Sequence, residues 1–160
     1  MSALRIATII YVLFLIAAVC VYHPATAVEL ERLIPVETLW ISKEDGLLAV
    51  NGIDVSGTGT SWEAAMEDLR ASAEGIVFTE SVERVVVSLE AAEYLRDVYA
   101  DEKLRPSVQL YLLEGAASER LDGFTAAHES DATVENKKAI PLITEQEGRY
   151  RFAGTEQGAA

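Results

Sequence analysis

The sequence predicts an α/β protein: an N-terminal signal or anchor helix followed by a small mixed-sheet domain with two to three helices. Three observations in the exported part predict this class. Asp45-Gly46 lies between two apolar runs, which is typical of a β-hairpin because glycine accepts the positive φ of the turn. Apolar residues recur at spacings of three and four from Trp62 to Ala73, as on one face of a helix. Residues 85–87 are three valines, as expected of a strand buried on both faces.

The first 27 residues have the three parts of a secretory signal peptide. Arg5 is the one charged residue before an apolar run over residues 6–22, and Ala25-Thr26-Ala27 follows with small residues at alternate positions. The run is 17 residues long, slightly long for a cleaved segment and slightly short for a bilayer span. Two outcomes stay open: cleavage after Ala27, or retention of residues 1–27 as a membrane anchor.

Cys20 is the single cysteine of the chain. The part beyond Ala27 therefore has no thiol for a disulfide, a nucleophile or a metal site. Lipid attachment at Cys20 is disfavoured by the bulky Val19 before it, since bacterial lipoproteins have a small residue there. The simpler interpretation is that Cys20 is an apolar residue of the anchor.

The exported part is strongly acidic. All 26 acidic residues lie after Val28, together with 12 of the 13 Lys and Arg residues, which gives this part a formal charge of −14. Such a surface repels nucleic-acid phosphates and anionic lipid headgroups, so no nucleic acid is expected as a partner. Membrane contact is expected through residues 1–27 alone. Arg5 favours the cytoplasmic side, which places the acidic part outside the cell.

The first half of the exported part is expected to form a hairpin, a loop and a helix. The hairpin covers residues 34–53 with its turn at 43–46. Residues 56–59, Ser-Gly-Thr-Gly, are interpreted as a flexible loop, and residues 60–63, Thr-Ser-Trp-Glu, as a capping box that opens the helix. The helix is expected to end at Gly75. Its inward stripe consists of Trp62, Ala65, Met66, Leu69 and Ala73.

The second half alternates strands with helices. Strands are expected over residues 76–78 and 82–89, and the second is the candidate for the centre of the sheet. Ser88 is expected to cap a helix that runs to about residue 100. A strand over residues 107–113 and a weak helix over 117–127 follow. The residues expected to face inward from the helix after Ser88 are Ala92, Leu95 and Tyr99.

The chain is expected to have four parts. These are a signal peptide or membrane anchor (1–27), a mixed α/β domain (28–127), a polar linker (128–138) and a terminal β-hairpin with a tail (139–160). The linker lacks apolar periodicity. The hairpin, in which Tyr150 alternates with arginines as in a strand with one buried face, is expected either to belong to a second unit or to extend the edge of the first.

The lack of a recognisable catalytic motif predicts that the chain is not an enzyme. His128 is the one histidine beyond the signal segment, and Ser130 and Asp131 beside it are sequence neighbours rather than a positioned triad. One histidine without cysteine makes a transition-metal site improbable. Residues 57–59, Gly-Thr-Gly, lack the lysine of a P-loop and the third glycine of a dinucleotide fingerprint. We therefore expect no catalytic, cofactor-binding or metal-ligating residues. Among the possible functions of the chain, a hydrolase that uses carboxylates ranks last.

The two tryptophans are candidate interaction residues. Trp40 lies in the first expected hairpin and Trp62 at the start of the first helix. A large aromatic side chain can anchor a partner or fill the core of a small domain. Trp62 is expected in the core, whereas both interpretations stay open for Trp40.

The order of elements resembles the N-terminal domain of the Ger(x)C family, the C subunits of nutrient germinant receptors in spore-forming bacteria. The chain is similar to a short, divergent member. The features that resemble the family are VELERL at 28–33, the turn ISKEDG at 41–46, the Gly-rich loop and tryptophan-opened helix at 57–69, the strand at 82–89 with its following helix, LRPSV at 104–108 before the strand at 110–114, and the strand pair from IPLI at 140–143 to FAG at 152–154.

The resemblance implies a non-enzymatic component of a spore germination receptor. Such a protein would act as a binding or scaffold module, with integral-membrane receptor subunits as partners, on the extracytoplasmic face of the spore inner membrane. The family has no known catalytic residues, so none is transferred to this chain. The alternative is a free secreted protein with a structural or inhibitory role.

Overall fold

The computed structural model describes residues 11, 12, 14, 32–115 and 117–156. The chain divides into two compact units, Met1–Arg32 and Leu33–Ala160. The expected signal or anchor segment, with Cys20 and the Ala-x-Ala site, lies outside the described residues except for positions 11, 12 and 14. Within the described residues, no helix is both long and apolar enough to cross a membrane.

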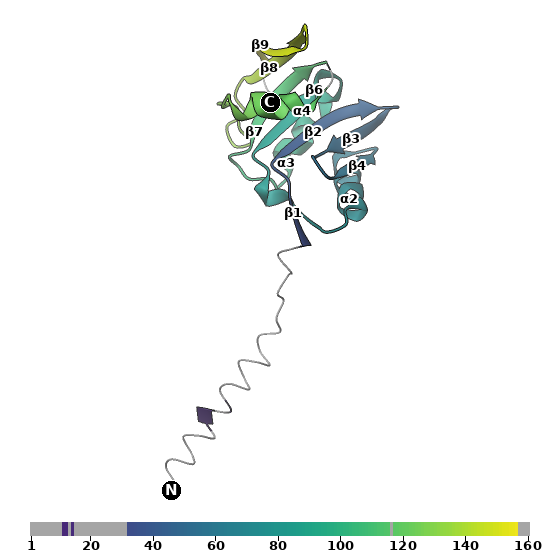
Figure 1. The fold of residues 1–160 in the computed structure, drawn as a ribbon, viewed down its shortest axis with the longest axis vertical. Helices are drawn as coiled ribbons and strands as arrows, with labels where there is room; N and C mark the ends of the chain where they lie inside the picture. Colours follow the sequence, from purple (N-terminus) through teal and green to yellow (C-terminus); the bar gives the residue numbers. More distant parts are fainter. Residues whose placement is uncertain (1–10, 13, 15–31, 116, 157–160) are drawn as a thin grey trace. The chain divides into compact units, whose positions relative to one another are not determined.

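The unit Leu33–Ala160 contains a seven-stranded mixed sheet, so the predicted mixed α/β class is confirmed (Figure 1). Its strand order is β4-β3-β2-β6-β7-β8-β9, with β2, β6, β7 and β8 parallel and β3, β4 and β9 antiparallel to their neighbours. β6 is the middle strand, as its run of valines predicts. The strands are β2 (Thr38–Glu44), β3 (Leu47–Asn51), β4 (Ser56–Gly59), β6 (Arg84–Ser88), β7 (Gln109–Glu114), β8 (Ile140–Gln146) and β9 (Arg149–Glu156).

A separate two-stranded parallel sheet joins β1 (Leu33–Pro35) to β5 (Ile76–Phe78). The one-turn helix η2 (Thr79–Ser81) follows β5. Its last residue, Ser81, accepts a hydrogen bond from the Val36 backbone N–H at 2.9 Å, and its hydroxyl lies 3.1 Å from the Val36 carbonyl oxygen. The start of the expected hairpin, residues 34 and 35, thus belongs to β1 and not to the large sheet.

Both hairpins predicted from the sequence are present. Asp45 and Gly46 have φ values of 51° and 82°, and Glu147 and Gly148 have 52° and 71°, so each turn places two residues in the left-handed region. The strand β8 pairs with β7 through the register Leu112↔Leu142. The second hairpin therefore extends the edge of the first sheet, which was one of the two alternatives.

Residues 128–138 do not form the polar linker that the sequence predicts. Ala132 and Val134 are 0% and 9% exposed and belong to the core. Their backbone pairs with the start of β7, where the Leu110 N–H donates to the Ala132 carbonyl at 2.9 Å and the Val134 N–H to the Val108 carbonyl at 3.2 Å. Two small apolar residues in a polar stretch give little periodicity, which is why the sequence pattern predicts a linker.

The helices differ from the sequence prediction in how they begin. α2 (Trp62–Ser72) has Ser61 as its N-cap, whose side chain accepts from the Ala64 N–H at 3.2 Å. Four residues of its predicted stripe, from Trp62 to Leu69, are buried, whereas Ala73 is half-buried and follows the helix, which ends before the predicted Gly75. The second predicted helix is a 3₁₀ segment, η3 (Leu89–Tyr94), followed by α3 (Leu95–Ala100). Ser88 makes no capping hydrogen bond, so the prediction that it caps this helix is wrong. The third helix is α4 (Glu119–Ala126).

Residues 56–59 form the edge strand β4 and not the expected flexible loop. Their glycines let α2 pack directly against this strand. A Cβ atom on Gly57 would lie 2.3 Å from the Leu69 nitrogen, and one on Gly59 would lie 2.4 Å from the Ala65 nitrogen. The glycines therefore serve close packing between a helix and a strand rather than chain flexibility.

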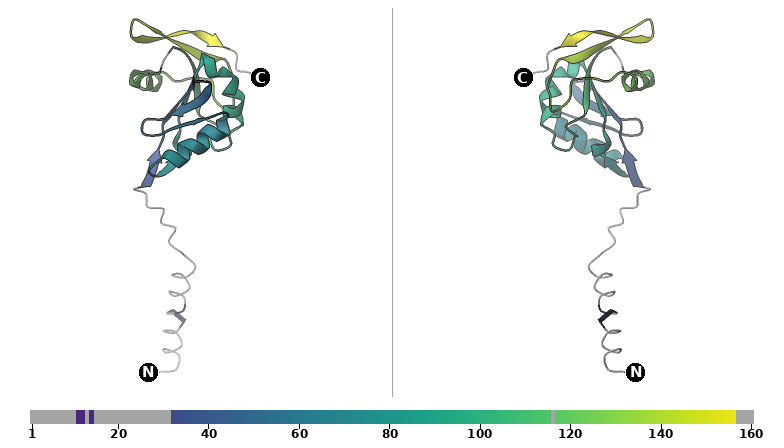
Figure 2. Two further views of the ribbon diagram at one scale, coloured as in Figure 1. Left: turned by 90° about the vertical axis from the view of Figure 1, so that its right-hand side faces the viewer. Right: turned by 90° about the vertical axis from the view of Figure 1, so that its left-hand side faces the viewer.

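The helices cover opposite faces of the sheet (Figure 2). On one face, α2 and α3 pack on the larger core cluster, which includes Leu39, Val85 and Leu110. On the other face, α4 contributes Leu121 to a smaller cluster with Val86, Tyr111, Leu113 and Ile143. Successive residues of β6 thus serve different cores, because neighbouring side chains of a strand point to opposite faces.

Tyr111 places a phenol inside the smaller cluster. Its side chain is 0% exposed, and its hydroxyl lies 2.8 Å from Gln109 Oε1 and within hydrogen-bond distance of the carbonyl oxygens of Thr125 and His128. Burial raises the pKa of Tyr111 to about 12, against a smaller opposing effect of the Arg84 charge. The neutral phenol is therefore the form that the fold stabilises.

Replacing Tyr111 with phenylalanine should change how stability depends on alkaline pH. Because the folded pKa lies above the usual value near 10, the Tyr111 contribution is complete below pH 10 and is lost as pH rises towards 12. The variant should be less stable than the natural protein by about 1 kcal/mol at pH 8, and this difference should shrink towards pH 12. Urea unfolding of both proteins at several pH values measures it. A constant difference would contradict a buried phenol.

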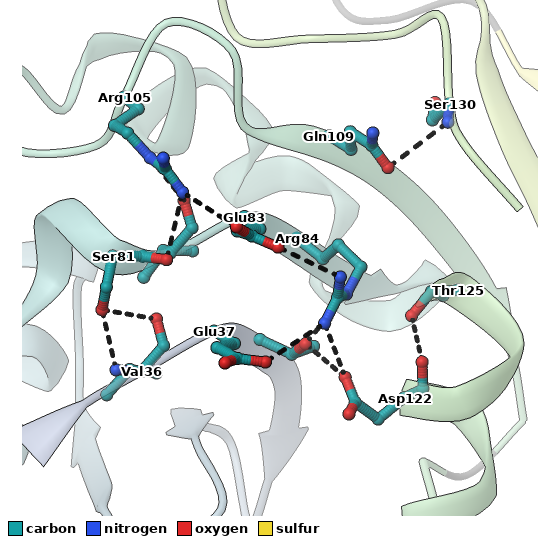
Figure 3. Close-up of polar contacts among 12 residues, drawn as sticks. Val36, Glu37, Ser81, Glu83, Arg84, Arg105, Gln109, Asp122, Thr125 and Ser130 are labelled. Atoms are coloured by element: carbon teal, nitrogen blue, oxygen red, sulfur yellow. Dashed lines mark hydrogen bonds and ion pairs between the residues drawn. The ribbon is translucent and has the colours of Figure 1, made fainter. Parts of the chain in front are cut away.

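A buried arginine fixes α4 to the amino ends of the parallel strands (Figure 3). The Arg84 side chain is 11% exposed. Its Nε donates to Thr38 Oγ1 at 3.2 Å, its Nη2 lies 3.4 Å from Asp122 Oδ1, and its Nη1 lies 3.4 Å from Glu83 Oε2. The Arg105 guanidinium reaches the same Glu83 carboxylate at 3.6 Å. This network joins β2, β6 and α4 at the end of the sheet opposite the groove described below.

Candidate functional site

A groove of about 810 Å³ opens at the carboxyl ends of the parallel strands. The last residues of three neighbouring strands line it: Glu44 of β2, Ser88 of β6 and Glu114 of β7. Leu89 and Glu90 of η3 add to its lining. Its remaining lining residues are Trp40, Ile41, Ser42, Lys43, Asn51, Val86, Leu113, Gly115, Ala117 and Ser118.

The chain topology explains why a groove lies here. After β6 the chain turns to the face that carries α3, and after the neighbouring β7 it turns to the face that carries α4. The two connections diverge, and both contribute lining residues, Leu89 from the first and Ala117 from the second. Open α/β sheets bind ligands in the crevice that such a switch leaves beyond the strand ends.

The floor of the groove is apolar. Val86 and Leu113 are 1% and 2% exposed, and the half-buried indole of Trp40 lies beside them on the same face of the sheet. A cavity of several hundred Å³ with an apolar floor and a few polar groups is the usual form of a small-molecule site. The structure therefore assigns Trp40, which the sequence left open between partner anchor and core, to the floor of this groove.

Two polar atoms of the groove lack a hydrogen-bond partner among the described residues: Trp40 Nε1 and Ser88 Oγ. Both atoms are buried. An unpaired buried donor costs about 1–3 kcal/mol, so native structures retain few of them.

The rim of the groove is negatively charged. Glu44, Glu90 and Glu114 are exposed and line it, and Lys43 is the one cation among the described lining residues. The Lys43 ammonium is already engaged, because Glu93 Oε1 lies 2.5 Å from it. The hydrogen bond to Glu93 raises the pKa of Lys43, so this amine stays protonated. Among the described residues, Glu44, Glu90 and Glu114 form no ion pair, although the charge of Glu90 also acts on Lys43.

The other residues weighed in the sequence do not converge on a site. Trp62 is 6% exposed and donates from Nε1 to Asp101 Oδ2 at 2.9 Å, so it lies in the core as predicted. His128 is exposed and stacks on Phe124 with ring centroids 4.5 Å apart. Ser130 is buried and its hydroxyl lies 3.1 Å from the Leu110 carbonyl oxygen, whereas Asp131 is exposed. Nothing in this geometry joins His128, Ser130 and Asp131 as a triad.

A second cavity, of about 490 Å³, lies between the start of α2 and the end of α3. Its charged lining residues are Glu63, Asp97, Asp101 and Glu102 with Arg70 and Lys103, so it is also acidic on balance. It is smaller than the groove and does not lie at the carboxyl ends of the parallel strands. The groove is the better candidate site.

The sequence signals that could have located the groove were weak. Ser88 was interpreted as a helix cap, and Glu44 and Glu114 are ordinary acidic residues in a chain with 26 of them. In the described part of the chain, no three His, Cys, Asp or Glu side chains lie close enough to hold a metal ion. Comparison with protein-family models, curated proteins and solved structures finds no match for this chain.

Proposed function

We propose that this protein is a non-enzymatic binding module held at the extracytoplasmic face of a membrane, with the groove as its binding site. The observation that carries the proposal is the groove itself, with an apolar floor and two unpaired polar atoms, Trp40 Nε1 and Ser88 Oγ. Its lining offers an indole, hydroxyls and carboxylates, which are groups that bind and orient a ligand.

The proposal extends to the kind of assembly. The order of elements in the sequence resembles the C subunit of a spore germinant receptor, in which a membrane-held domain serves as a binding or scaffold component beside integral-membrane subunits. The signal-like residues 1–27, with Arg5 before the apolar run, support a location outside the cytoplasm for the part that follows. The second candidate is a free secreted protein with the same groove, which the Ala25-Thr26-Ala27 sequence favours if it is cleaved.

Fractionation of spores or cells separates these two functions. We expect the protein in the membrane fraction, with residues 1–27 retained or with a lipid on Cys20, and mass spectrometry of the isolated protein would identify its N-terminus. Protein found only in soluble fractions and beginning at Val28 would overturn the membrane-held module and leave the secreted alternative.

A Cys20→Ser variant is the matched control for the mode of attachment. If residues 1–27 anchor the protein by themselves, the variant should stay in the membrane fraction, because serine changes little in a 17-residue apolar run. If a lipid is the anchor, the variant should move to the soluble fraction. Either result keeps the membrane-held module, and the two differ in what holds it.

A further inference from the structure

The geometry points to a small organic cation, an ammonium group on an apolar body, as the ligand of the groove. This inference rests on the proposed binding function and adds the chemical class of ligand. It stands on two features of the groove: the charge of its rim and the aromatic surface of its floor.

The rim of the groove favours a positively charged ligand. Glu44 ends β2, Glu114 ends β7 and Glu90 lies just beyond the end of β6, so three carboxylates gather around one opening. Lys43, the one cation among the described lining residues, forms an ion pair with Glu93 and lies 5.8 Å from the centroid of the Tyr94 ring. Three carboxylates against this one lysine repel an anionic ligand, whereas an ammonium ion would be attracted by each carboxylate.

The floor selects an apolar body and adds to the preference for a cation. The half-buried Trp40 indole, which packs against the buried Val86 and Leu113, is the apolar surface that a short hydrocarbon chain can cover. An indole ring is also the aromatic side chain that attracts a cation most strongly through its π face. Apolar burial and charge attraction can therefore act on the same ligand.

Binding of three six-carbon probes to the full-length protein in phosphatidylcholine nanodiscs tests the inference. Hexylamine, 1-hexanol and hexanoate share the apolar chain and differ in charge. We expect saturable binding of hexylamine by calorimetry and a change in Trp40 fluorescence, with 1-hexanol about tenfold weaker and hexanoate without binding. Added salt should weaken the binding of hexylamine and leave the binding of 1-hexanol unchanged. A Trp40→Phe variant should lose the fluorescence change, since the other tryptophan, Trp62, lies outside the groove.

Rim variants make the test specific. Glu114→Gln should lower the affinity for hexylamine about two- to fivefold, the range for one exposed ion pair, and leave the affinity for 1-hexanol unchanged. Glu114→Lys should weaken hexylamine further and permit hexanoate to bind. Glu135→Gln, an exposed residue that is not part of the groove lining, should change neither.

The outcomes separate this inference from the proposed function. Equal affinities for hexylamine and 1-hexanol, or tighter hexanoate, would overturn the cationic ligand while leaving the groove as a binding site. An absence of binding for all three probes would also overturn it, and the fractionation experiment would then decide the membrane-held module by itself. Amine binding that Glu114→Gln and Trp40→Phe leave unaltered would place the amine elsewhere and overturn the inference.

Discussion

Val85→Asp should unfold the unit Leu33–Ala160 at room temperature. Val85 is 0% exposed in the middle strand of the sheet, faces α2 and α3 and pairs in register with Leu39 and Leu110. An aspartate there would be buried without a cationic partner, which costs about 5 kcal/mol or more. That is comparable to the whole stability of a small domain. Circular dichroism with urea titration would measure the loss.

Two further variants complete this test. Val86→Asp should also be strongly destabilising, because Val86 is 1% exposed and packs with Tyr111 and Leu121 in the smaller cluster. Glu135→Ala changes an exposed side chain and should stay within about 0.5 kcal/mol of the natural protein. Similar unfolding midpoints for Val85→Asp and Glu135→Ala would contradict the placement of β6 at the centre of the sheet.

Gly57→Ala should destabilise the protein by about 3 kcal/mol, although it adds a single methyl group. That methyl would lie 2.3 Å from the backbone nitrogen of Leu69 and 2.4 Å from the carbonyl oxygen of Ala65, so α2 would have to move away from β4. Backbone atoms cannot turn aside as a side chain can. The melting temperature should fall by roughly 10 °C, measured by differential scanning calorimetry.

Gly123→Ala is the matched control for Gly57→Ala. Gly123 lies inside α4, is exposed, and a Cβ atom there would have no heavy atom within 4 Å. Alanine favours the helix over glycine, so this variant should be more stable by about 0.5–1 kcal/mol. If both alanine variants shifted stability in the same direction, close packing of α2 on β4 would not explain why position 57 requires glycine.

The elements that could be predicted from the sequence are those whose cause is local. Asp45-Gly46 and Glu147-Gly148 adopt the turn conformations that their types favour. The stripe from Trp62 to Leu69 is buried because its spacing matches one helical face. The valines of β6 are buried on both faces, as a run without alternation indicates.

The elements that could not be predicted are determined by distant parts of the chain. β4 looks like a loop because its glycines have no side chain to show a period, and its pairing with β3 is what makes it a strand. Residues 130–134 are held by the start of β7, about 20 residues earlier. Arg84 contacts Thr38 and Asp122, which lie 46 and 38 residues away in the sequence. A local sequence pattern does not encode such contacts.

The groove was missed for the same reason. Its lining comes from β2, β3, β6, η3, β7 and the segment before α4, and these segments meet only once the strand order is known. Ser88 was interpreted through its local role as a cap, whereas its position at the end of a parallel strand gives it a place in the groove. Trp40 could not be assigned because its exposure depends on where α4 lies over the sheet.

The pairing of β1 with β5 has a mechanical consequence. β1 is the first strand of its unit, so tension applied from the N-terminal side enters the fold there. A pull along β1 acts in shear on the three residue pairs that join β1 to β5. The next contacts to carry the force are the hydrogen bonds between the Ser81 hydroxyl and the Val36 backbone. Residues 33–36, which make these contacts, precede β2 in the chain. Under such a pull these contacts should therefore break before the seven-stranded sheet and its groove are loaded.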